Sequence, residues 1–477
     1  MDSKERPTPF ASLWLSKTGA FFLSLSAALV LWVFLQSKGL HDLYISTRDY
    51  DLDTIPDFSH LADYCADASP ISSAEFYQRQ KSLAGILHSL NASAYIAEPG
   101  ANAQFFGNIS SSQWHLSERP LLLIVSPYLV NEGVEAKITV VTPSFEATRA
   151  KLLPIPSASD VAFAEWPEDV NPYDVAISAV PASGEGRGTI FVDESIRHFI
   201  VDGLVEAAPK LKISSAPLEI RHIREKKSAA EIELLKCANE ARFISNISRS
   251  LFRWLIHSLQ VTLLAIRAVR DQMYIGIRES QVRHMMENAL STAGLQDLFA
   301  LVLFGANAAL PHGSGTDRAL SKHDFTLIDT GGTLYGYNSD VTRTFALRTS
   351  VIPPENRRIW DYVHEAQNVA GDTARSGVVT GKVDEMARAY LGLMGYGQYF
   401  THRLGHGIGL EGHEQPYLRG GNHDTIQIGH TFSNEPGIYI EGVVGVRLED
   451  CFYIGGKGLP IFLTAGVGGQ SQDPWRP

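Results

Sequence analysis

The chain has 477 residues, with 41 Lys and Arg against 52 Asp and Glu, which gives a net charge of −11 at neutral pH. Its composition, 44% hydrophobic and 19% charged, is that of a globular protein and excludes wholesale disorder, while the acidic balance disfavours a nucleic-acid-binding protein, which needs a basic surface. The length favours two domains, because a single core rarely grows beyond roughly 250–300 residues, and the three cysteines (Cys65, Cys237 and Cys451) cannot build a disulfide framework.

The first predicted element is an uncharged stretch at residues 18–37, reading TGAFFLSLSAALVLWVFLQS. As a helix rising about 1.5 Å per residue it would span about 30 Å, the thickness of a bilayer core. Lys17 and Lys38 bracket it, and no small-residue cleavage site of the A-x-A kind follows it. We therefore predict a short N-terminal tail at 1–17 and a transmembrane signal anchor at 18–37. A cleaved signal peptide and a buried soluble helix are the alternatives.

The charges around this stretch predict its orientation. Basic residues lie on both sides of it, Lys4, Arg6 and Lys17 before and Lys38 and Arg48 soon after. The small excess before the stretch favours a single-pass membrane protein whose bulk is lumenal or extracellular, with a secreted form as the alternative. N-x-S sequons at Asn91, Asn108 and Asn246 agree with this orientation, although chance also produces such sequons in a chain of this size.

Residues 45–216 alternate short apolar runs with helical stretches, which is typical of a small α/β domain. Ser72 and Glu75 have the spacing of a capping box before a helix at 76–90. The other predicted elements are strands at 94–97, 121–126, 136–141 and 189–192 and helices at 145–153 and 195–208. No convergent set of catalytic residues is evident here, so we interpret this region as a scaffold that shapes a neighbouring site.

A second domain is predicted at residues 217–477. Ser228 and Glu231 form another capping box, and apolar residues follow at helical spacing from Ile232. A helix continuing unbroken to residue 270 would far exceed the usual length of about 11–12 residues. We therefore expect an interruption, and 241–260 is its expected place.

Acidic residues beside apolar strand residues mark the candidate site. Asp329 ends a predicted strand at 325–329, a Gly-containing turn follows, and Asp340 precedes a strand-like run at 341–347. Glu435 and Glu449 also lie beside apolar residues, where a lone buried charge would be costly. Carboxylates across a hairpin can point into one cavity, and four that converge repel one another unless a cation neutralises them.

A Gly-rich segment at 404–414 supplies His406 and His413. Oxygen ligands with one imidazole suit a hard or borderline divalent ion, manganese first and then zinc, cobalt or iron, and four carboxylates can serve two ions about 3.5–4 Å apart. The segment also matches G-x-G-x-x-G, but Pro416 and further glycines follow, so no helix can open there and a dinucleotide loop is excluded. His402 and His406 are spaced for one helix face, yet the glycines favour a loop or strand.

These residues resemble the pita-bread metallopeptidases, a family that includes methionine aminopeptidase and, closer to this chain, aminopeptidase P and prolidase. The matching motifs are Asn307-Ala-Ala-Leu-Pro-His312-Gly, the Asp329 and Asp340 pair, His406 with His413, Glu435-Pro-Gly, and Arg447-x-Glu449-Asp450. The resemblance covers residues 217–477 firmly and the preceding region loosely. It implies an α+β pita-bread catalytic domain at 217–477 after a creatinase-like α/β domain at 45–216.

The resemblance also implies a role for each site residue. The implied ligands of two divalent ions are Asp329, Asp340, His406, Glu435 and Glu449, with Asp340 and Glu449 bridging both ions. His312 and His413 would contact the substrate and the developing oxyanion, and His402 and Arg447 would bind substrate. Glu435 would also relay a proton while a metal-activated hydroxide attacks the peptide carbonyl.

The implied activity is that of a metallo-exopeptidase acting at the N-terminal end of peptides, as an Xaa-Pro aminopeptidase or an Xaa-Pro dipeptidase. Its partners would be peptide substrates and, through the anchor, a membrane, with no nucleic acid; a homodimer stays open. Two alternatives remain, a different metal-dependent hydrolase on the same fold and a catalytically inactive module that binds peptides or proteins. The complete ligand set argues against the inactive module.

One segment departs from the family. Relatives run from Glu240 almost directly into a helix like the one expected from Val261, so residues 241–260 are extra. They are either a surface insertion or a translated intron, and we favour the intron. In that case the sequon at Asn246 has no meaning.

Overall fold

The computed structural model describes residues 56–62, 64–131, 133–181, 188–239 and 261–477. The predicted anchor at 18–37 and the extra segment at 241–260 lie outside these residues, so both stay predictions. No helix in the part of the chain that is described has the length and apolar character that crossing a bilayer requires. Pro56–Pro477 forms one compact unit, and the division near residue 217 also stays a prediction.

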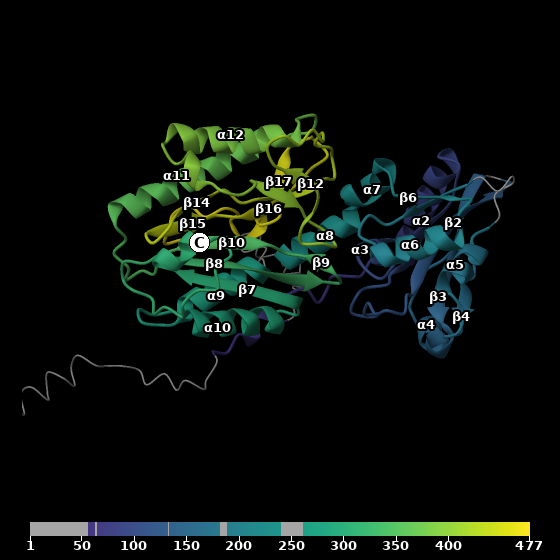
Figure 1. Cartoon of the computed structure of the whole chain (residues 1–477). Helices are drawn as coiled ribbons and strands as arrows, with labels where there is room; N and C mark the ends of the chain where they lie inside the picture. The colour runs from purple at the N-terminus through teal and green to yellow at the C-terminus, as the bar shows by residue number, and fades with distance from the viewer. Residues whose placement is uncertain (1–55, 63, 132, 182–187, 240–260) are drawn as a thin grey trace, which may run out of the picture. The chain divides into compact units, whose positions relative to one another are not determined.

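A six-stranded mixed sheet precedes the candidate site in the chain (Figure 1). In spatial order its strands are β4 Ala162–Trp166, β3 Gly133–Pro143, β2 Leu122–Val130, β1 Ala92–Ala97, β5 Thr189–Val192 and β6 Lys212–Ser215. The pairs β1–β2 and β2–β3 are antiparallel and the other pairs are parallel. Each of the four strands predicted in this region is present, and β2 and β3 run further than predicted.

Helices cover both faces of this sheet. The helices are α2 Ser73–Ser89, α3 Ala101–Gly107 and α4 Ala147–Lys151 on one face, and α5 Pro172–Ala179 and α6 His198–Ala207 on the other. Period-two alternation along β2 supplies both cores, because Leu123 packs with α2 and α3 while Leu122 packs with α5 and α6. α2 begins as its capping box predicts, with the Ser72 side chain accepting a hydrogen bond from the Glu75 N–H.

The rest of the described chain packs smaller sheets against two groups of helices (Figure 1). The strand orders are β10-β8-β7 with β9 beside β8, then β12-β11-β13-β16-β17, and β14-β15. The strands are β7 Gln296–Phe304, β8 Thr326–Leu334, β9 Tyr337–Asn338, β10 Val341–Phe345, β11 Gly405–Gly407, β12 Glu414–Leu418, β13 Thr431–Asn434, β14 Gly437–Ile440, β15 Val444–Arg447, β16 Asp450–Ile454 and β17 Pro460–Phe462. The helices are α7 Leu218–Glu225, α8 Ala229–Asn239, α9 Val261–Gln272, α10 Glu279–Thr292, α11 Pro354–Thr373 and α12 Thr380–Leu393.

Two cores hold these elements together. Apolar side chains of α8, α9 and α10 pack with those of β7 and β8, and side chains of α11 and α12 pack with those of β13 and β16. α8 begins at the predicted capping box, in which the Ser228 N–H donates to Glu231 and the Glu231 N–H donates to the Ser228 hydroxyl. The G-x-G-x-x-G segment joins β11 to β12 without a helix, which agrees with the exclusion of a dinucleotide loop.

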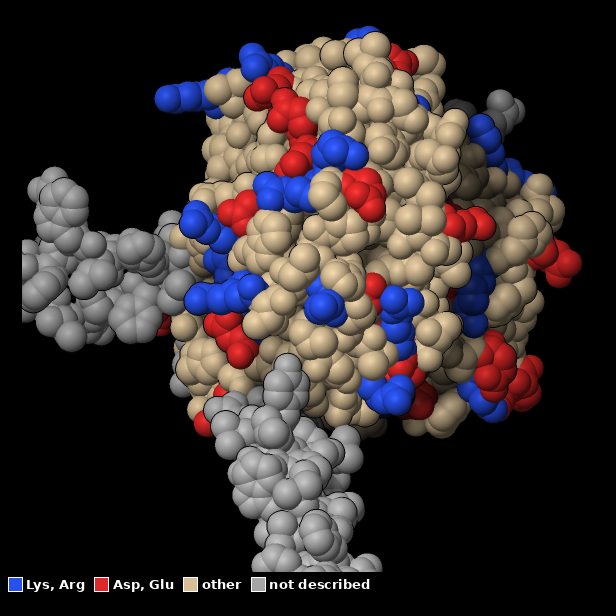
Figure 2. Space-filling model, turned by 90° about the vertical axis from the view of Figure 1, so that its left-hand side faces the viewer, with Lys and Arg blue, Asp and Glu red and all other residues tan. Residues whose placement is uncertain are grey.

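Surface charge on one face agrees with the acidic composition. On the face drawn in Figure 2, basic and acidic side chains are interspersed among uncharged ones, and no continuous basic stripe is visible.

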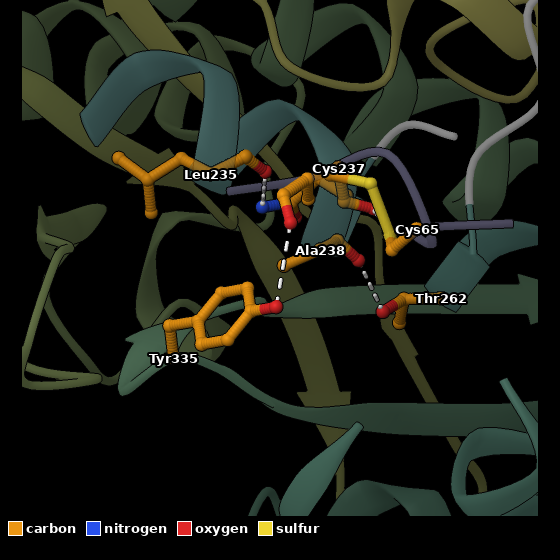
Figure 3. Close-up of a disulfide and its surroundings, with 8 residues drawn as sticks. Cys65, Leu235, Cys237, Ala238, Thr262 and Tyr335 are labelled. Atoms are coloured by element: carbon orange, nitrogen blue, oxygen red, sulfur yellow. Dashed lines mark hydrogen bonds between the residues drawn. A yellow bond between two sulfur atoms is a disulfide. The ribbon is translucent and has the colours of Figure 1, made fainter. Parts of the chain in front are cut away.

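Cys65 and Cys237 form a disulfide, with their Cα atoms 5.9 Å apart (Figure 3). The bridge ties the segment before α2 to helix α8 across a sequence separation of 172 residues. Cys451 is a buried free thiol. The cysteine count excludes a framework of several bridges, as predicted, but it did not indicate this single long-range bridge.

Candidate metal centre

The first two predicted ligands lie on neighbouring strands of one sheet. Asp329 lies in β8 and Asp340 directly precedes β10. The prediction that a strand ends at Asp329 and a glycine turn follows was wrong, because β8 continues through Gly331 and Gly332 to Leu334 and the turn lies at Tyr335 and Gly336. These strands pair antiparallel with Asp329 opposite Thr342, so the hairpin brings the two carboxylates close together, as the sequence predicts. Both side chains lie at the buried end of the hairpin, where each is largely shielded from water.

The other three predicted ligands come from the five-stranded sheet. His406 lies in β11, Glu435 follows β13, and Glu449 precedes β16. Because β13 and β16 pair antiparallel through their adjoining residues, Glu435 and Glu449 lie opposite each other. The Glu449 N–H donates to the Thr342 carbonyl at 3.0 Å, which joins this sheet to the strand that follows Asp340.

These five side chains converge. The His406 Nε2 lies 3.3 Å from a Glu435 oxygen and 3.7 Å from an Asp340 oxygen. Ligand atoms lie within 4.8 Å of one another in each of three overlapping groups, which are Asp329–Asp340–Glu449, His406–Glu435–Glu449 and Asp340–His406–His413. Each of the five predicted ligands occurs in at least one of these groups, and His406 occurs in two of them.

Burial and mutual repulsion disfavour the charged carboxylates. Burial, followed by the charges of Asp329 and Glu435, raises the pKa of Asp340 well above its ordinary value. Burial, followed by Asp340, has the same effect on the pKa of Glu449, and burial raises the pKa of Glu435 to about 7. Burial lowers the pKa of His406 to about 3, so its imidazole is neutral near pH 7 and free to act as a ligand.

The donor set fits divalent metal ions. Asp329 Oδ1 and Glu449 Oε1 are buried and have no hydrogen-bond partner among the described residues. A buried carboxylate oxygen without a partner is costly, and a cation beside it would remove both that cost and the repulsion among the four carboxylates. Carboxylate oxygens with one neutral imidazole are a suitable ligand set for such an ion.

Arg447 contacts a ligand directly. Its Nη2 donates to Asp329 Oδ2 at 2.6 Å, and its Nε donates to the Thr342 hydroxyl at 3.1 Å. That hydroxyl in turn donates to Glu449 Oε2 at 2.7 Å. Arg447 is only 2% exposed, so its guanidinium orients two of the ligand carboxylates. Its predicted contact with substrate stays a prediction.

His402 is linked to the same arginine through a tyrosine. Arg447 Nη1 donates to the Tyr439 hydroxyl at 3.1 Å, and that hydroxyl lies 2.8 Å from His402 Nε2. The other ring nitrogen lies 2.7 Å from the Arg403 carbonyl, which requires a proton on Nδ1 and leaves Nε2 to accept from Tyr439. Burial lowers the pKa of His402 to about 4, in keeping with this neutral form.

The two histidines predicted to contact substrate differ in their surroundings. The His413 ring lies 4.1 Å from the His406 ring, centroid to centroid, and His413 is itself exposed. Burial, followed by the charges of Arg403 and His312, lowers the pKa of His413. His312 is exposed on the loop after β7. Their roles at the oxyanion and the substrate stay predictions.

Sequence reasoning missed the residue that organises the His312 loop. The buried carboxylate of Glu279, the first residue of α10, accepts from the Phe304 N–H at 2.8 Å and from the Asn307 amide at 2.9 and 3.0 Å. It also accepts from the N–H groups of Thr316 at 3.2 Å and Arg318 at 3.0 Å. One side chain thus fixes both ends of the loop. Its only sequence signal is an acidic residue at a helix start, where acidic residues are common in any case.

A buried ion pair next to His413 was also missed. Lys227 Nζ donates to Glu414 Oε1 at 2.6 Å and to the Arg224 carbonyl at 2.8 Å, and the Lys227 and Glu414 side chains are 1% and 2% exposed. Glu414 begins β12 directly after His413. The pair therefore fixes the backbone that carries His413, and nothing in the spacing of these two residues could have revealed it.

Comparisons with known proteins agree with this geometry. Residues 254–455 match the profile described as metallopeptidase family M24. An uncharacterized peptidase of Schizosaccharomyces pombe is 34% identical over 418 residues, which is 86% of each chain. A protein of Pyrococcus horikoshii named Xaa-Pro dipeptidase is 30% identical over 273 residues, covering 57% of this chain and 71% of its own length.

A solved structure extends the similarity to the fold. The dipeptidase PepE of Mycobacterium ulcerans superposes with a TM-score of 0.70 at 27% identity, covering 83% of this chain and 97% of its own. The similarity therefore includes the six-stranded sheet as well as the candidate metal centre. The predicted pita-bread architecture of the catalytic part is confirmed.

Proposed function

This chain belongs to metallopeptidase family M24, and we propose that it is an exopeptidase that cleaves Xaa-Pro bonds at the N-terminal end of peptides with two divalent metal ions. The observation that carries the proposal is the buried cluster of Asp329, Asp340, His406, Glu435 and Glu449, in which two carboxylate oxygens have no partner. The preference for proline is supported by the name of the Pyrococcus relative and by the motifs shared with aminopeptidase P and prolidase.

The five clustered side chains would hold the ions, manganese being the first candidate and zinc, cobalt and iron the others. Such ions supply Lewis acidity and an activated water. Asp340 and Glu449 each occur in groups with proposed ligands from both sheets, so these two carboxylates would serve both ions. Arg447 orients Asp329 directly and Glu449 through Thr342.

The remaining steps belong to protein groups. Glu435 can take up a proton and pass it to the leaving nitrogen. An imidazole N–H of His413 can donate to the oxyanion that forms when the carbonyl is attacked. The contacts of His402 with Tyr439 and Arg403 suit its neutral form. His402 would therefore contact a substrate side chain as an uncharged imidazole ring.

Substrate profiling tests the proposal. The full chain, with and without prior chelation, should be given an Xaa-Pro dipeptide, a longer Xaa-Pro peptide and matched peptides with alanine in place of proline. We expect cleavage only before proline, loss of cleavage on chelation and recovery with manganese. Equal cleavage before alanine would contradict the proline preference, and a protein that binds no metal would contradict the whole proposal. The two proline substrates separate a dipeptidase from an aminopeptidase.

We also propose that residues 18–37 anchor the protein in a membrane with the catalytic part lumenal or extracellular. The uncharged stretch supports the anchor. The Cys65–Cys237 disulfide supports the side of the membrane, because such bonds persist in oxidising compartments and are rare in the cytosol. The protein should stay with membranes after carbonate extraction. Recovery of a soluble form that begins near residue 38 would indicate the secreted alternative instead.

A further inference from the structure

The sequon at Asn91 lies on an open turn of the fold. Asn91 follows α2 and precedes β1, and its φ of 51° is a left-handed conformation that asparagine adopts more readily than most residues. Its side chain is exposed, and no hydrogen bond of that side chain is found within the described residues. The side chain is therefore accessible and not engaged within the described residues, as an acceptor of a bulky modification must be.

The sequon at Asn108 lies in a different environment. Asn108 caps the C-terminal end of α3 and is half-buried. Its Nδ2 donates to the Pro154 carbonyl at 3.0 Å, and the residue lines a cavity of about 610 Å³ together with Gln113 and Tyr335. A sugar on this nitrogen would have to fit between these groups. The two sequons thus form an internal comparison, because both adjoin elements that pack on the six-stranded sheet and they differ in accessibility.

The disulfide supplies the second observation. Figure 3 shows Cys65, on the segment before α2, bonded to Cys237 of α8. Their Cα separation of 5.9 Å is that of an ordinary bridge. Such a bridge indicates folding in an oxidising compartment, and in eukaryotic cells this is also where oligosaccharide is transferred to N-x-S sequons. The bridge indicates this compartment independently of the sequon, and an accessible sequon in this compartment meets the transfer machinery.

We propose that Asn91 carries an N-linked glycan and that Asn108 does not. The co-reactant is a lipid-pyrophosphate-linked oligosaccharide. A bond forms between Asn91 Nδ2 and C1 of the first sugar, the bond between C1 and the pyrophosphate oxygen breaks, the lipid pyrophosphate leaves, and the amide gives up one proton. The proposal rests on the lumenal or extracellular location proposed above, and it is independent of the peptidase activity.

Three variants of the full chain, made in a eukaryotic secretory host, test the proposal. Asn91→Gln removes the acceptor, and Ser93→Ala removes the sequon hydroxyl while keeping the asparagine. Ser93 Oγ is buried without a hydrogen-bond partner, so its loss should not disturb the fold, whereas glutamine at a positive φ is mildly strained. Asn108→Gln is the matched control. Wild type and Asn108→Gln should have the same mobility, and the other two variants should each be smaller by one glycan.

Peptide mapping gives the decisive readout. Chymotrypsin cleaves after aromatic residues, and Tyr95 and Phe105 lie between the two sequons, so each asparagine falls in its own peptide. After enzymatic deglycosylation, the Asn91 peptide should contain aspartate and the Asn108 peptide asparagine. An unmodified Asn91 peptide, or a modified Asn108 peptide, would overturn the proposal.

Thiol alkylation of the same preparation tests the proposed location separately from the proposed glycan. A bridged Cys65–Cys237 pair with an unmodified Asn91 would overturn the glycan alone. Free thiols together with an unmodified Asn91 would overturn the lumenal or extracellular location as well. Hydrolysis of an Xaa-Pro peptide by that preparation reports on the peptidase proposal separately, since neither Asn91 nor Ser93 belongs to the metal centre.

Discussion

The hydrogen bonds of Glu279 predict that Glu279→Gln disturbs the loop that carries His312. The metal ligands should be disturbed less than this loop. In the wild type, Phe304 and Asn307 donate to one carboxylate oxygen, and Thr316, Arg318 and Asn307 donate to the other. Glutamine keeps the shape but replaces one oxygen with an NH₂ group. In either orientation of the amide, at least one backbone N–H then faces another donor.

The cost follows from these contacts. A hydrogen bond to a charged group contributes about 1.5–3 kcal/mol, and a buried donor left without a partner costs about 1–3 kcal/mol. With one or two N–H groups affected, Glu279→Gln should lower the free energy of unfolding by about 2–5 kcal/mol. The loop would also lose its fixed ends, and a displacement of about 1 Å at a substrate-contacting group can cost about 10²-fold in rate. We therefore expect kcat/KM to fall at least about tenfold, while the bound metal stays unchanged.

Thermal melting, metal analysis and steady-state kinetics on one preparation check this prediction. Glu287→Gln is the matched control, because Glu287 lies on the same helix and is exposed, and such surface changes usually stay within about 0.5 kcal/mol. If Glu279→Gln melted with the control and kept the wild-type kcat/KM, the five hydrogen bonds would not be holding the loop. A loss of metal would instead show that the damage reaches the metal centre.

Three further predictions concern single groups of the site and its surroundings. Asp340→Ala or Glu449→Ala should abolish activity and lower metal content, since both carboxylates are assigned to both ions; full metal occupancy with normal turnover would refute the assignment. His413→Ala should keep its metal and its melting temperature while kcat falls by about 10²–10³ and KM changes less, whereas a less stable variant with normal turnover would indicate a packing role. Burial, followed by the charge of Lys227, lowers the pKa of His430 to about 3, below its unfolded value near 6.5, so its contribution to stability is present above pH 6.5 and is lost as the pH falls. At pH 5 this loss is about 2 kcal/mol, and His430→Gln should melt with a correspondingly flatter dependence on pH between 6.5 and 5.

Local patterns predicted the elements that carry the site, because short-range physics determines them. Both predicted capping positions start helices, since a serine hydroxyl accepts from the N–H three residues on at Ser72 and at Ser228. The carboxylate half of the box is present only at α8, where Glu231 accepts from the Ser228 N–H. The strands that hold Asp329 and Asp340 were recognisable from their apolar runs. The strand predicted from the apolar run at 121–126 continues past Pro127 to Val130 as β2, whose last residues form an exposed hairpin arm.

One helix predicted within residues 45–216 was too long, for a physical reason. The helix expected at 145–153 consists of a 3₁₀ turn at Ser144–Glu146 followed by α4, Ala147–Lys151. Pro143 and Pro154 bracket the segment, and proline both fixes its own φ and disfavours helix in the residue before it. The segment is therefore helical only in its centre.

Contacts between distant residues were beyond sequence reasoning. The pairing of Cys65 with Cys237 spans 172 residues, and three cysteines permit more than one pairing. Arg447 was assigned to substrate by resemblance, and only the packing of β15 beside β8 and β10 reveals that its guanidinium lies on Asp329. Such partners are determined by sheet register and not by spacing along the chain.

The residues that were missed share a physical character that explains why they matter. Glu279, Lys227 and Glu414 are charged, almost fully buried and paired within the protein, and none of them is a proposed ligand or a proposed substrate contact. Isolated buried charges are expensive, so each is tolerated only where the fold supplies several partners at short distances. Glu279 fixes the loop of His312, and the Lys227–Glu414 pair fixes the strand that follows His413. His312 and His413, the two histidines expected to contact the substrate, are therefore exposed side chains on segments that buried, paired charges hold in place. The metal ligands are held by the sheets themselves. A substitution in these supports should lower turnover while leaving metal binding intact, whereas loss of a ligand should lower both.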